Sequence, residues 1–268
     1  MQPAAPAPWR PWRVAPLSEF EVADAAGVVG LVQVDAKNFV VTTAFRFSDI
    51  DVQAMLVKQI TDAGKSDAQA KAMMTDACNY TLGAEDDTDM ASVPRFMRWF
   101  ENTYGLHTLA AIIHDRLITS GKPNSGALGS DTLSDRFFRE MMRSAGVPCL
   151  KRWIMWAAVA MRTRWAAGGL RRLTVLLWTA LAAAGLGLFV NAAGAALFGM
   201  PRLFDPWAML LVAVVLPVVS APLWGRQFGA GLVAAVAALW ILPAAGFGLL
   251  GYFVYRVLER MVDQFARR

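Results

Sequence analysis

The chain has 268 residues, of which 56% are hydrophobic and 18% are charged. Since an ordinary soluble domain is about 25% charged, this composition excludes both a chain disordered throughout and one with a normal soluble surface along its whole length. The net charge of +5 is divided unevenly: residues 1–150 carry 14 Lys and Arg against 18 Asp and Glu, whereas residues 151–268 carry 12 against 3. We therefore expect an acidic soluble module followed by a basic, apolar membrane module.

Two further classes are excluded by what the front half lacks. Cys78 and Cys149 are the only cysteines and stand far apart, so a disulfide scaffold and a cysteine metal motif are not expected, and both thiols should be reduced. The acidic front half has no basic stripe with interleaved aromatic residues, so no nucleic-acid partner is expected.

The first segment, residues 1–19, is predicted to be a disordered arm, because five of its first sixteen residues are proline. No apolar run of about 7–15 residues follows its basic residues, so it does not resemble a signal peptide. We therefore expect the front half to stay in the cytoplasm.

A small soluble α+β domain is predicted over residues 20–165. Two runs rich in β-branched and aromatic residues, 28–34 and 39–47, are joined by a short polar turn and predict a β-hairpin. A helical insert follows over about 50–80, with a break at residues 64–66, and then an acidic loop at 83–89. Further helices are predicted from Pro94, over 106–117, and over 133–145, the last of which ends at Gly146.

Residues 151–165 allow two interpretations. Their Trp and Arg content is typical of an amphipathic helix that lies on the membrane surface. The alternative is the last helix of the soluble domain, packed through Ile154, Val159 and Met161.

The C-terminal part is predicted to be an all-α membrane region, residues 173–256, with three spans at about 173–200, 206–225 and 227–255. The uncharged stretches 173–201, 206–225 and 227–255 each reach the roughly 20 apolar residues that a span needs. A very apolar soluble bundle is the alternative. Small residues in the spans, such as Gly185 and Gly229, would allow close helix packing, including a homo-oligomer.

The basic residues predict the orientation. Six of them lie between residues 151 and 172 with no acidic residue among them, whereas the loop after the first span has only Arg202 and Asp205. The positive-inside rule then places residues 1–172 in the cytoplasm of a multi-pass membrane protein. Three spans would put the C-terminal arginines outside, which the same rule disfavours.

Four polar residues of the soluble domain are the candidate site: Asp89, His114, Asp115 and Asp135. All four side chains suit acid–base catalysis. Three of them, Asp89, His114 and Asp135, also suit the binding of a divalent metal ion, which is the cofactor that this pattern favours. Structural roles compete with this hypothesis. Asp89 can cap the helix near Pro94, and Asp135 can lock a buried His114 in place.

The order of four motifs resembles one family. They are TDMASVPR at residues 88–95, AAIIHDRL at 110–117, SDRFF at 134–138 and AGVP at 145–148. They resemble the phage and bacterial family known as domain of unknown function 1353, over roughly residues 20–165. Met90, Arg116 and Ile118 depart from the glycine, tryptophan and tyrosine typical of that family. The resemblance implies a bacterial or prophage origin, which together with the predicted spans gives a bacterial inner-membrane location. It matches Asp89, His114, Asp115 and Asp135 to the family's polar positions without implying a reaction.

Two functional hypotheses follow. The first is a membrane-anchored protein whose cytoplasmic module binds an unknown protein or small molecule. The alternative is a membrane-tethered, metal-dependent hydrolase that uses Asp89, His114, Asp115 and Asp135. Convergence of these side chains in an accessible pocket would favour the hydrolase, whereas burial in pairs would favour binding or structure.

Overall fold

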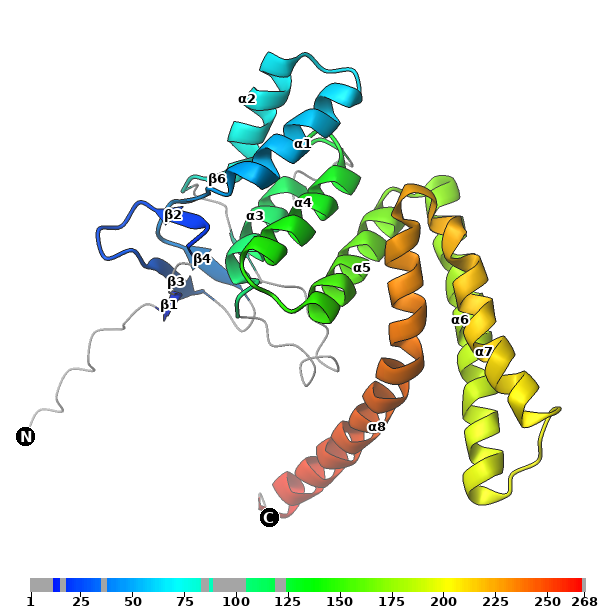
Figure 1. The fold of residues 1–268 in the computed structure, drawn as a ribbon. Helices are drawn as coiled ribbons and strands as arrows, with labels where there is room; N and C mark the ends of the chain where they lie inside the picture. Colours follow the sequence, from blue (N-terminus) through cyan, green and yellow to red (C-terminus); the bar gives the residue numbers. More distant parts are fainter. Residues whose placement is uncertain are drawn as a thin grey trace, which may run out of the picture. The chain divides into compact units, whose positions relative to one another are not determined.

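The described residues are mostly helical, with two small antiparallel sheets and two long apolar helices among them (Figure 1). A computed structural model describes residues 12–14, 18–34, 38–82, 87–88, 105–118 and 124–266. The chain divides into two compact units. The N-terminal unit comprises Met1–Ser92 and Thr103–Cys149, and the C-terminal unit comprises Val93–Asn102 and Leu150–Arg268.

Two sheets form the β part of the N-terminal unit. The first has the order β1-β3-β4-β7, from Trp12–Val14, Val29–Gln33, Phe39–Val41 and Asp87–Thr88. The second has the order β2-β5-β6, from Phe20–Val22, Phe45–Phe47 and Asn79–Tyr80. Every neighbouring pair of these strands is antiparallel.

The predicted hairpin is confirmed, but its second run divides between the two sheets. Strands β3 and β4 pair with Leu31 opposite Val41, whereas β5 leaves to pair with β2 and β6. Thr42 and Thr43 turn the chain over Gly30, whose N–H donates to the Thr43 hydroxyl at 3.0 Å. A side chain at Gly30 would collide with Thr42, so this crossing requires glycine.

An aromatic cluster forms the core behind the second sheet. Alternate residues of its strands, Phe20, Phe45, Phe47 and Tyr80, are buried on one face. Phe45 stacks on Tyr80 with ring centroids 5.1 Å apart, and Phe47 contacts Phe137 edge-on at 5.5 Å. Phe137 belongs to a helix, so these contacts fasten the sheet to the helical part of the unit.

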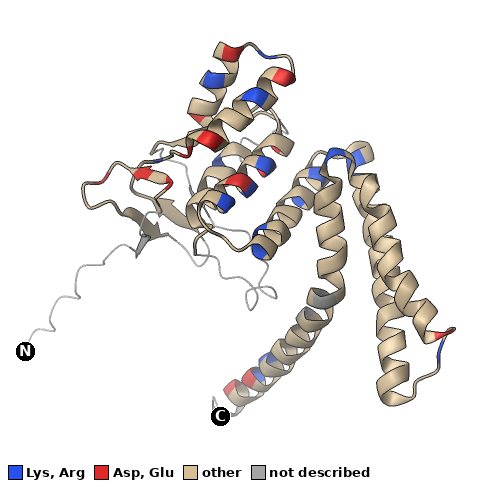
Figure 2. Ribbon diagram, viewed as in Figure 1, with Lys and Arg blue, Asp and Glu red and all other residues tan. Residues whose placement is uncertain are grey.

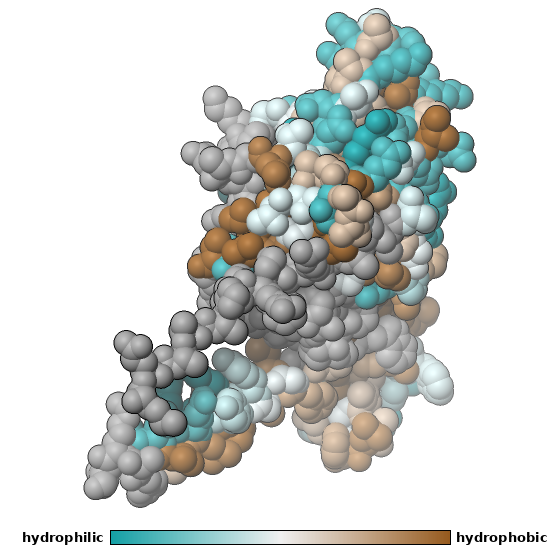
Figure 3. Space-filling model, turned by 90° about the vertical axis from the view of Figure 1, so that its left-hand side faces the viewer, coloured by the Kyte–Doolittle hydropathy of each residue, from teal (hydrophilic) through white to brown (hydrophobic). Residues whose placement is uncertain are grey.

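The predicted helical insert consists of α1 (Ile50–Asp62) and α2 (Asp67–Cys78). Asp49 caps α1 by accepting from the backbone N–H groups of Asp51 and Val52. Val52, Leu56 and Ile60 of α1 are buried at four-residue spacing, which is the inward face of an amphipathic helix. The surface over these two helices is mainly hydrophilic (Figure 3).

Two packed helices follow, α3 (Thr108–Ile118) and α4 (Asp131–Ser144), close to the predicted 106–117 and 133–145. Asn124 and Asp131 fix the start of α4, because each side chain accepts from the other's backbone N–H. Gly146, with φ of +74°, ends the helix in the left-handed region.

The C-terminal unit is entirely helical in its described residues. It contains α5 (Cys149–Ala166), α6 (Gly169–Phe198), α7 (Pro206–Ser220), the 3-10 helix η2 (Ala221–Gln227) and α8 (Phe228–Ala266). Asp205 caps α7 with Pro206 in the first turn. Gly225, at φ 56° and ψ −124°, reverses the chain between η2 and α8.

Small residues bring α6 and α7 together as an antiparallel helical hairpin (Figure 1). A Cβ atom on Gly185 would lie 2.7 Å from the carbonyl oxygen of Ala213, so the two backbones are in direct contact there. This glycine therefore serves packing within one chain.

Tryptophans form the core of the C-terminal unit. Trp156 of α5, Trp178 of α6 and Trp224 of η2 are buried together with alanines of α5, α6 and α8. The Trp178 and Trp224 rings contact edge-on with centroids 5.2 Å apart. The buried face of α5 thus packs within this unit through Trp156, Ala157 and Ala160. Two of the expected residues, Val159 and Met161, are partly buried and pack against the same core.

Within the part of the chain that the structure describes, two segments are long and apolar enough to cross a membrane, on length and composition alone: Gly169–Phe198 and Pro206–Leu239. The first is α6, and the second joins α7, η2 and the beginning of α8. The three-span division stays a prediction.

Several expectations concern the ends and loops of the N-terminal unit. The arm at 1–19 was expected to be disordered, but Trp12–Val14 forms β1 against β3. The Trp and Val of β1 suit a short edge strand between two prolines. The high proline content of the whole arm hides this local preference. The helix from Pro94, Asp89 and most of the acidic loop lie outside the described residues.

Candidate functional site

His114 and Asp135 are brought together by the packing of α3 against α4. The imidazole Nε2 lies 2.9 Å from the Asp135 carboxylate. His114 is 3% exposed and Asp135 is 0% exposed. The Phe138 ring lies beside the imidazole, with centroids 4.9 Å apart. The pair is thus a polar contact enclosed by an apolar core.

The chemistry of this pair follows from its burial. An ionised carboxylate only accepts hydrogen bonds, so Nε2–H of His114 donates to Asp135. A carboxylate that holds an imidazole in this way orients a catalytic base or a metal ligand in many enzymes. Both side chains are buried here, so the contact joins two helices and presents neither group to a solute.

The other two predicted site residues do not complete a cluster in the described structure. Asp115 follows His114 on α3 and is partly exposed. It projects about 100° further round the helix. Asp89 lies outside the described residues. Within the described residues, no three His, Cys, Asp or Glu side chains are grouped so as to hold a metal ion.

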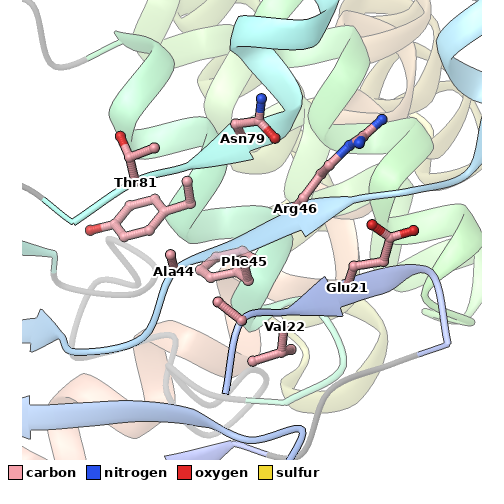
Figure 4. Close-up of a pocket in the computed structure, with 9 residues that line it drawn as sticks. Glu21, Val22, Ala44, Phe45, Arg46, Asn79 and Thr81 are labelled. Carbon is pink, nitrogen blue, oxygen red and sulfur yellow. The ribbon is translucent and has the colours of Figure 1, made fainter. Parts of the chain in front are cut away.

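A shallow pocket lies elsewhere in the N-terminal unit, over the strands β2, β5 and β6 (Figure 4). Its volume is about 330 Å³, and Glu21, Arg46 and Asn79 lie in its wall. These three residues form one row across the sheet, because Glu21 pairs with Arg46 and Arg46 pairs with Asn79. Neither His114 nor Asp135 lines this pocket.

The polar row is the outward face of the sheet whose other face is the aromatic core. Each of the two strands β2 and β5 has one charged residue between two apolar ones, so alternation turns the charge outward. This alternation was readable in the sequence as FEV and FRF. The pairing of the two strands and β6 was not readable, because their partners are distant in the chain.

Arg116 fixes one side of the pocket. Its guanidinium donates to the backbone carbonyl of Asn79, and its Nη2 lies 3.4 Å from the Asp76 carboxylate. Arg116 is one of the residues that depart from the expected family motif. It therefore ties β6 to α3 at the end of the helical insert.

Cys78 precedes this strand as an inert thiol. It is fully buried, and burial raises its pKa to about 12, although Arg46 opposes the shift. A buried thiol with so high a pKa is not a nucleophile at neutral pH.

The segment that contains α3 and α4 is similar to a known family. Residues 79–159 match the family described as Protein of unknown function (DUF1353). Over this segment the chain resembles the DUF1353 family. The match includes β6, α3, α4 and much of α5, whereas the expected resemblance began at about residue 20. Comparisons with curated proteins and with solved structures each gave no match.

The DUF1353 match covers some elements of the chain and leaves others outside. The insert α1–α2 and the helices α6–α8 lie outside it. His114, Asp115 and Asp135 lie inside it. The buried contact between α3 and α4 is therefore part of the DUF1353 segment.

Proposed function

We propose that this protein is a bacterial inner-membrane protein, anchored by its C-terminal helices, whose N-terminal unit binds a small ligand in the cytoplasm. The observation that carries the anchor is the exposure of the apolar helices. Only 17% of the most apolar part of α6 is buried within the protein. Side chains such as Leu177, Leu197 and Phe198 are exposed.

Lipid is the environment that suits such a surface. A core helix of a soluble protein buries most of its apolar side chains, because each buried Leu or Phe contributes about 1.5–3 kcal/mol. Exposed in water, the leucines and phenylalanines of α6 would form a large apolar surface patch that promotes aggregation. Against lipid tails the same side chains need no protein cover.

Helix lengths support three passes. Helix α6 has 30 residues, which gives about 45 Å and exceeds the roughly 30 Å of a bilayer core. Helix α7 alone has 15 residues, or about 22 Å, and η2 extends the same pass before Gly225 reverses the chain. Helix α8, with 39 residues, is long enough for the third pass.

Membrane fractionation tests the anchor. The full chain should stay in the membrane pellet after washing with alkaline carbonate, and a tag after Arg268 should be reached only from the periplasmic side. Release of the protein by carbonate would contradict the anchor. A tag reached from the cytoplasm would contradict three passes but not the anchor.

The pocket over β2, β5 and β6 is the proposed ligand site. Its volume of about 330 Å³ is at the lower end of small-molecule sites. Arg46 supplies a guanidinium in the centre of the polar row, which suits a carboxylate or phosphate group on the ligand. We propose a small anionic ligand.

A thermal-shift titration tests this site with named probes. Small carboxylates and inorganic phosphate are added to the full chain, and a saturable rise in melting temperature is expected for at least one of them. Arg46→Gln should abolish the rise, while Lys65→Gln, on the exposed turn between α1 and α2, should keep it. An equal rise in both variants would place the binding elsewhere.

The hydrolase alternative needs a third ligand beside His114 and Asp135, and Asp89 is the predicted one. Metal analysis of the purified chain tests this hypothesis directly. If the protein is not a metalloenzyme, wild type and His114→Ala will carry the same trace of divalent metal. About one equivalent in the wild type, lost in His114→Ala, would favour the hydrolase.

A further inference from the structure

We propose that the C-terminal unit binds the phosphate of an anionic phospholipid headgroup at a cluster of three exposed arginines, Arg171, Arg172 and Arg226. The inference rests on the proposed membrane anchor and names the lipid that its cytoplasmic end selects. We call these three residues the arginine cluster.

The arginine cluster forms where α6 begins and η2 turns into α8, at one end of the helical unit (Figure 2). Helix α6 contacts η2 directly. All three side chains belong to exposed residues. From residue 150 to residue 227 the only acidic residue is Asp205, which caps α7 at the far end of α6. The cluster therefore has no carboxylate beside it in this stretch of the chain.

The beginning of α6 is an unfavourable place for arginines unless an anion binds there. A helix N-terminus carries a partial positive charge and favours acidic side chains. The first turn of α6 has no acidic residue, and Gly168 before it provides no side-chain cap. Backbone N–H groups and two arginines thus point to a negative partner from outside the chain.

Arg164 adds a buried guanidinium near Arg171 at this end of the unit. It is 9% exposed and donates to the carbonyls of Trp224 and Leu223 at 2.7 and 2.9 Å, and to the Thr174 hydroxyl at 2.9 Å. Among the described residues its buried Nε atom has no hydrogen-bond partner. Burial lowers the pKa of Arg164, and the nearby charge of Arg171 lowers it further.

Arg164 also gives the arginine cluster a fixed frame. Its bonds to Trp224 and Leu223 hold η2 against α5, and the Thr174 bond reaches α6. The turn that carries Arg226 is thereby held beside the beginning of α6. Arg172 is positioned as well, since its Nε donates to the Trp165 carbonyl and its guanidinium lies 5.1 Å from the Trp165 ring. Trp and Arg together are typical of the headgroup region of a membrane.

The other end of the helices lacks this excess charge. The turn between α6 and α7 contains Arg202 and Asp205, and the described end of α8 has two arginines and two acidic residues. Arg256 is paired with Glu259 at 2.9 Å. An anionic lipid is therefore selected at the arginine cluster and not at the opposite end.

Lipid titration of the full chain in an uncharged detergent tests the proposal. Phosphatidylglycerol, phosphatidylcholine and inorganic phosphate are the probes, and binding is counted by native mass spectrometry. The wild type should bind phosphatidylglycerol at least tenfold more tightly than phosphatidylcholine. Each basic residue near an anionic surface contributes about fivefold, so Arg171→Gln/Arg172→Gln/Arg226→Gln should weaken binding roughly a hundredfold.

The matched control removes the same charge elsewhere. Arg202→Gln/Arg256→Gln/Arg260→Gln should bind phosphatidylglycerol within about threefold of the wild type. Equal binding of both lipids by the wild type would overturn the proposal, and this arm needs no variant. Equal losses in both triple variants would do so too, as would displacement of the lipid by millimolar phosphate. Release by carbonate tests the anchor separately, since the lipid preference is measured in detergent.

Discussion

Replacing His114 with alanine should destabilise the N-terminal unit by about 3–5 kcal/mol. The wild-type imidazole donates to a carboxylate that is 0% exposed, at 2.9 Å. Losing a hydrogen bond to a buried charged acceptor costs about 1.5–3 kcal/mol, and the missing ring leaves a gap beside Phe138 that adds a packing loss. Asp135→Asn should cost less, because the amide oxygen still accepts from the imidazole.

Cys78 provides the assay. Its thiol is buried at the end of α2 with a pKa raised to about 12, whereas Cys149 is exposed. In a Cys149→Ser background, labelling of Cys78 at neutral pH requires opening of the N-terminal unit, so its rate follows the opened fraction. A loss of about 3 kcal/mol should speed labelling by roughly a hundredfold.

An exposed ion pair serves as the control. Lys71 and Asp67 are 2.7 Å apart with both side chains more than half exposed, and such pairs contribute at most about 1 kcal/mol. Lys71→Gln should therefore speed labelling by less than about fivefold. If Cys78 in His114→Ala is also labelled at nearly the wild-type rate, the contact between His114 and Asp135 does not stabilise the unit. That result would favour a functional role for His114.

Three further predictions address other parts of the chain. Gly185→Ala should lower the melting temperature of the full chain in detergent, because the added Cβ meets a backbone oxygen at 2.7 Å, whereas Gly187→Ala meets nothing within 4 Å and should not. Burial alone would raise the pKa of Asp49, but hydrogen bonds from Ser144 and two backbone N–H groups lower it overall. That carboxylate therefore stabilises the fold above its ordinary pKa near 4 and loses the effect as the pH falls through the lowered value. Urea unfolding should show Asp49→Asn to be destabilised at pH 7 and equal to the wild type near pH 2. A chain ended at Pro148 should be more soluble than one ended at Trp165, because the longer chain exposes the buried face of α5; equal solubility by gel filtration would count against the packing of α5.

Local patterns predicted the helices well. The repeats of apolar residues in α1 and α3 and the glycine after α4 mark those helices in the sequence, and the structure has them within about two residues. The hairpin β3–β4 was also predictable, because its strands are adjacent in the chain. The division of residues 39–47 between two sheets was not, because it depends on contacts with β2 and β6.

The candidate site shows the same limit. The sequence predicted that Asp135 could hold His114 in place, because both residues lie on predicted helices and a carboxylate is a common partner of a buried imidazole. Their joint burial was one of the two alternatives that the sequence left open, and burial is what separates a structural contact from a reactive one. The pocket around Arg46 was missed because its three polar residues come from strands up to 58 positions apart.

Helix α5 shows why the family boundary is not a structural boundary. The DUF1353 match ends at residue 159, within a helix that continues to Ala166. Trp156 lies inside the match, yet it packs with Trp178 and Trp224, which lie outside it. A helix that buries its tryptophan against the appended segments cannot be an independent end of the family domain. The apolar helices and the last part of the family segment therefore fold as one unit, and Arg164, just beyond the match, joins α5 to η2 through the backbone carbonyls of Leu223 and Trp224.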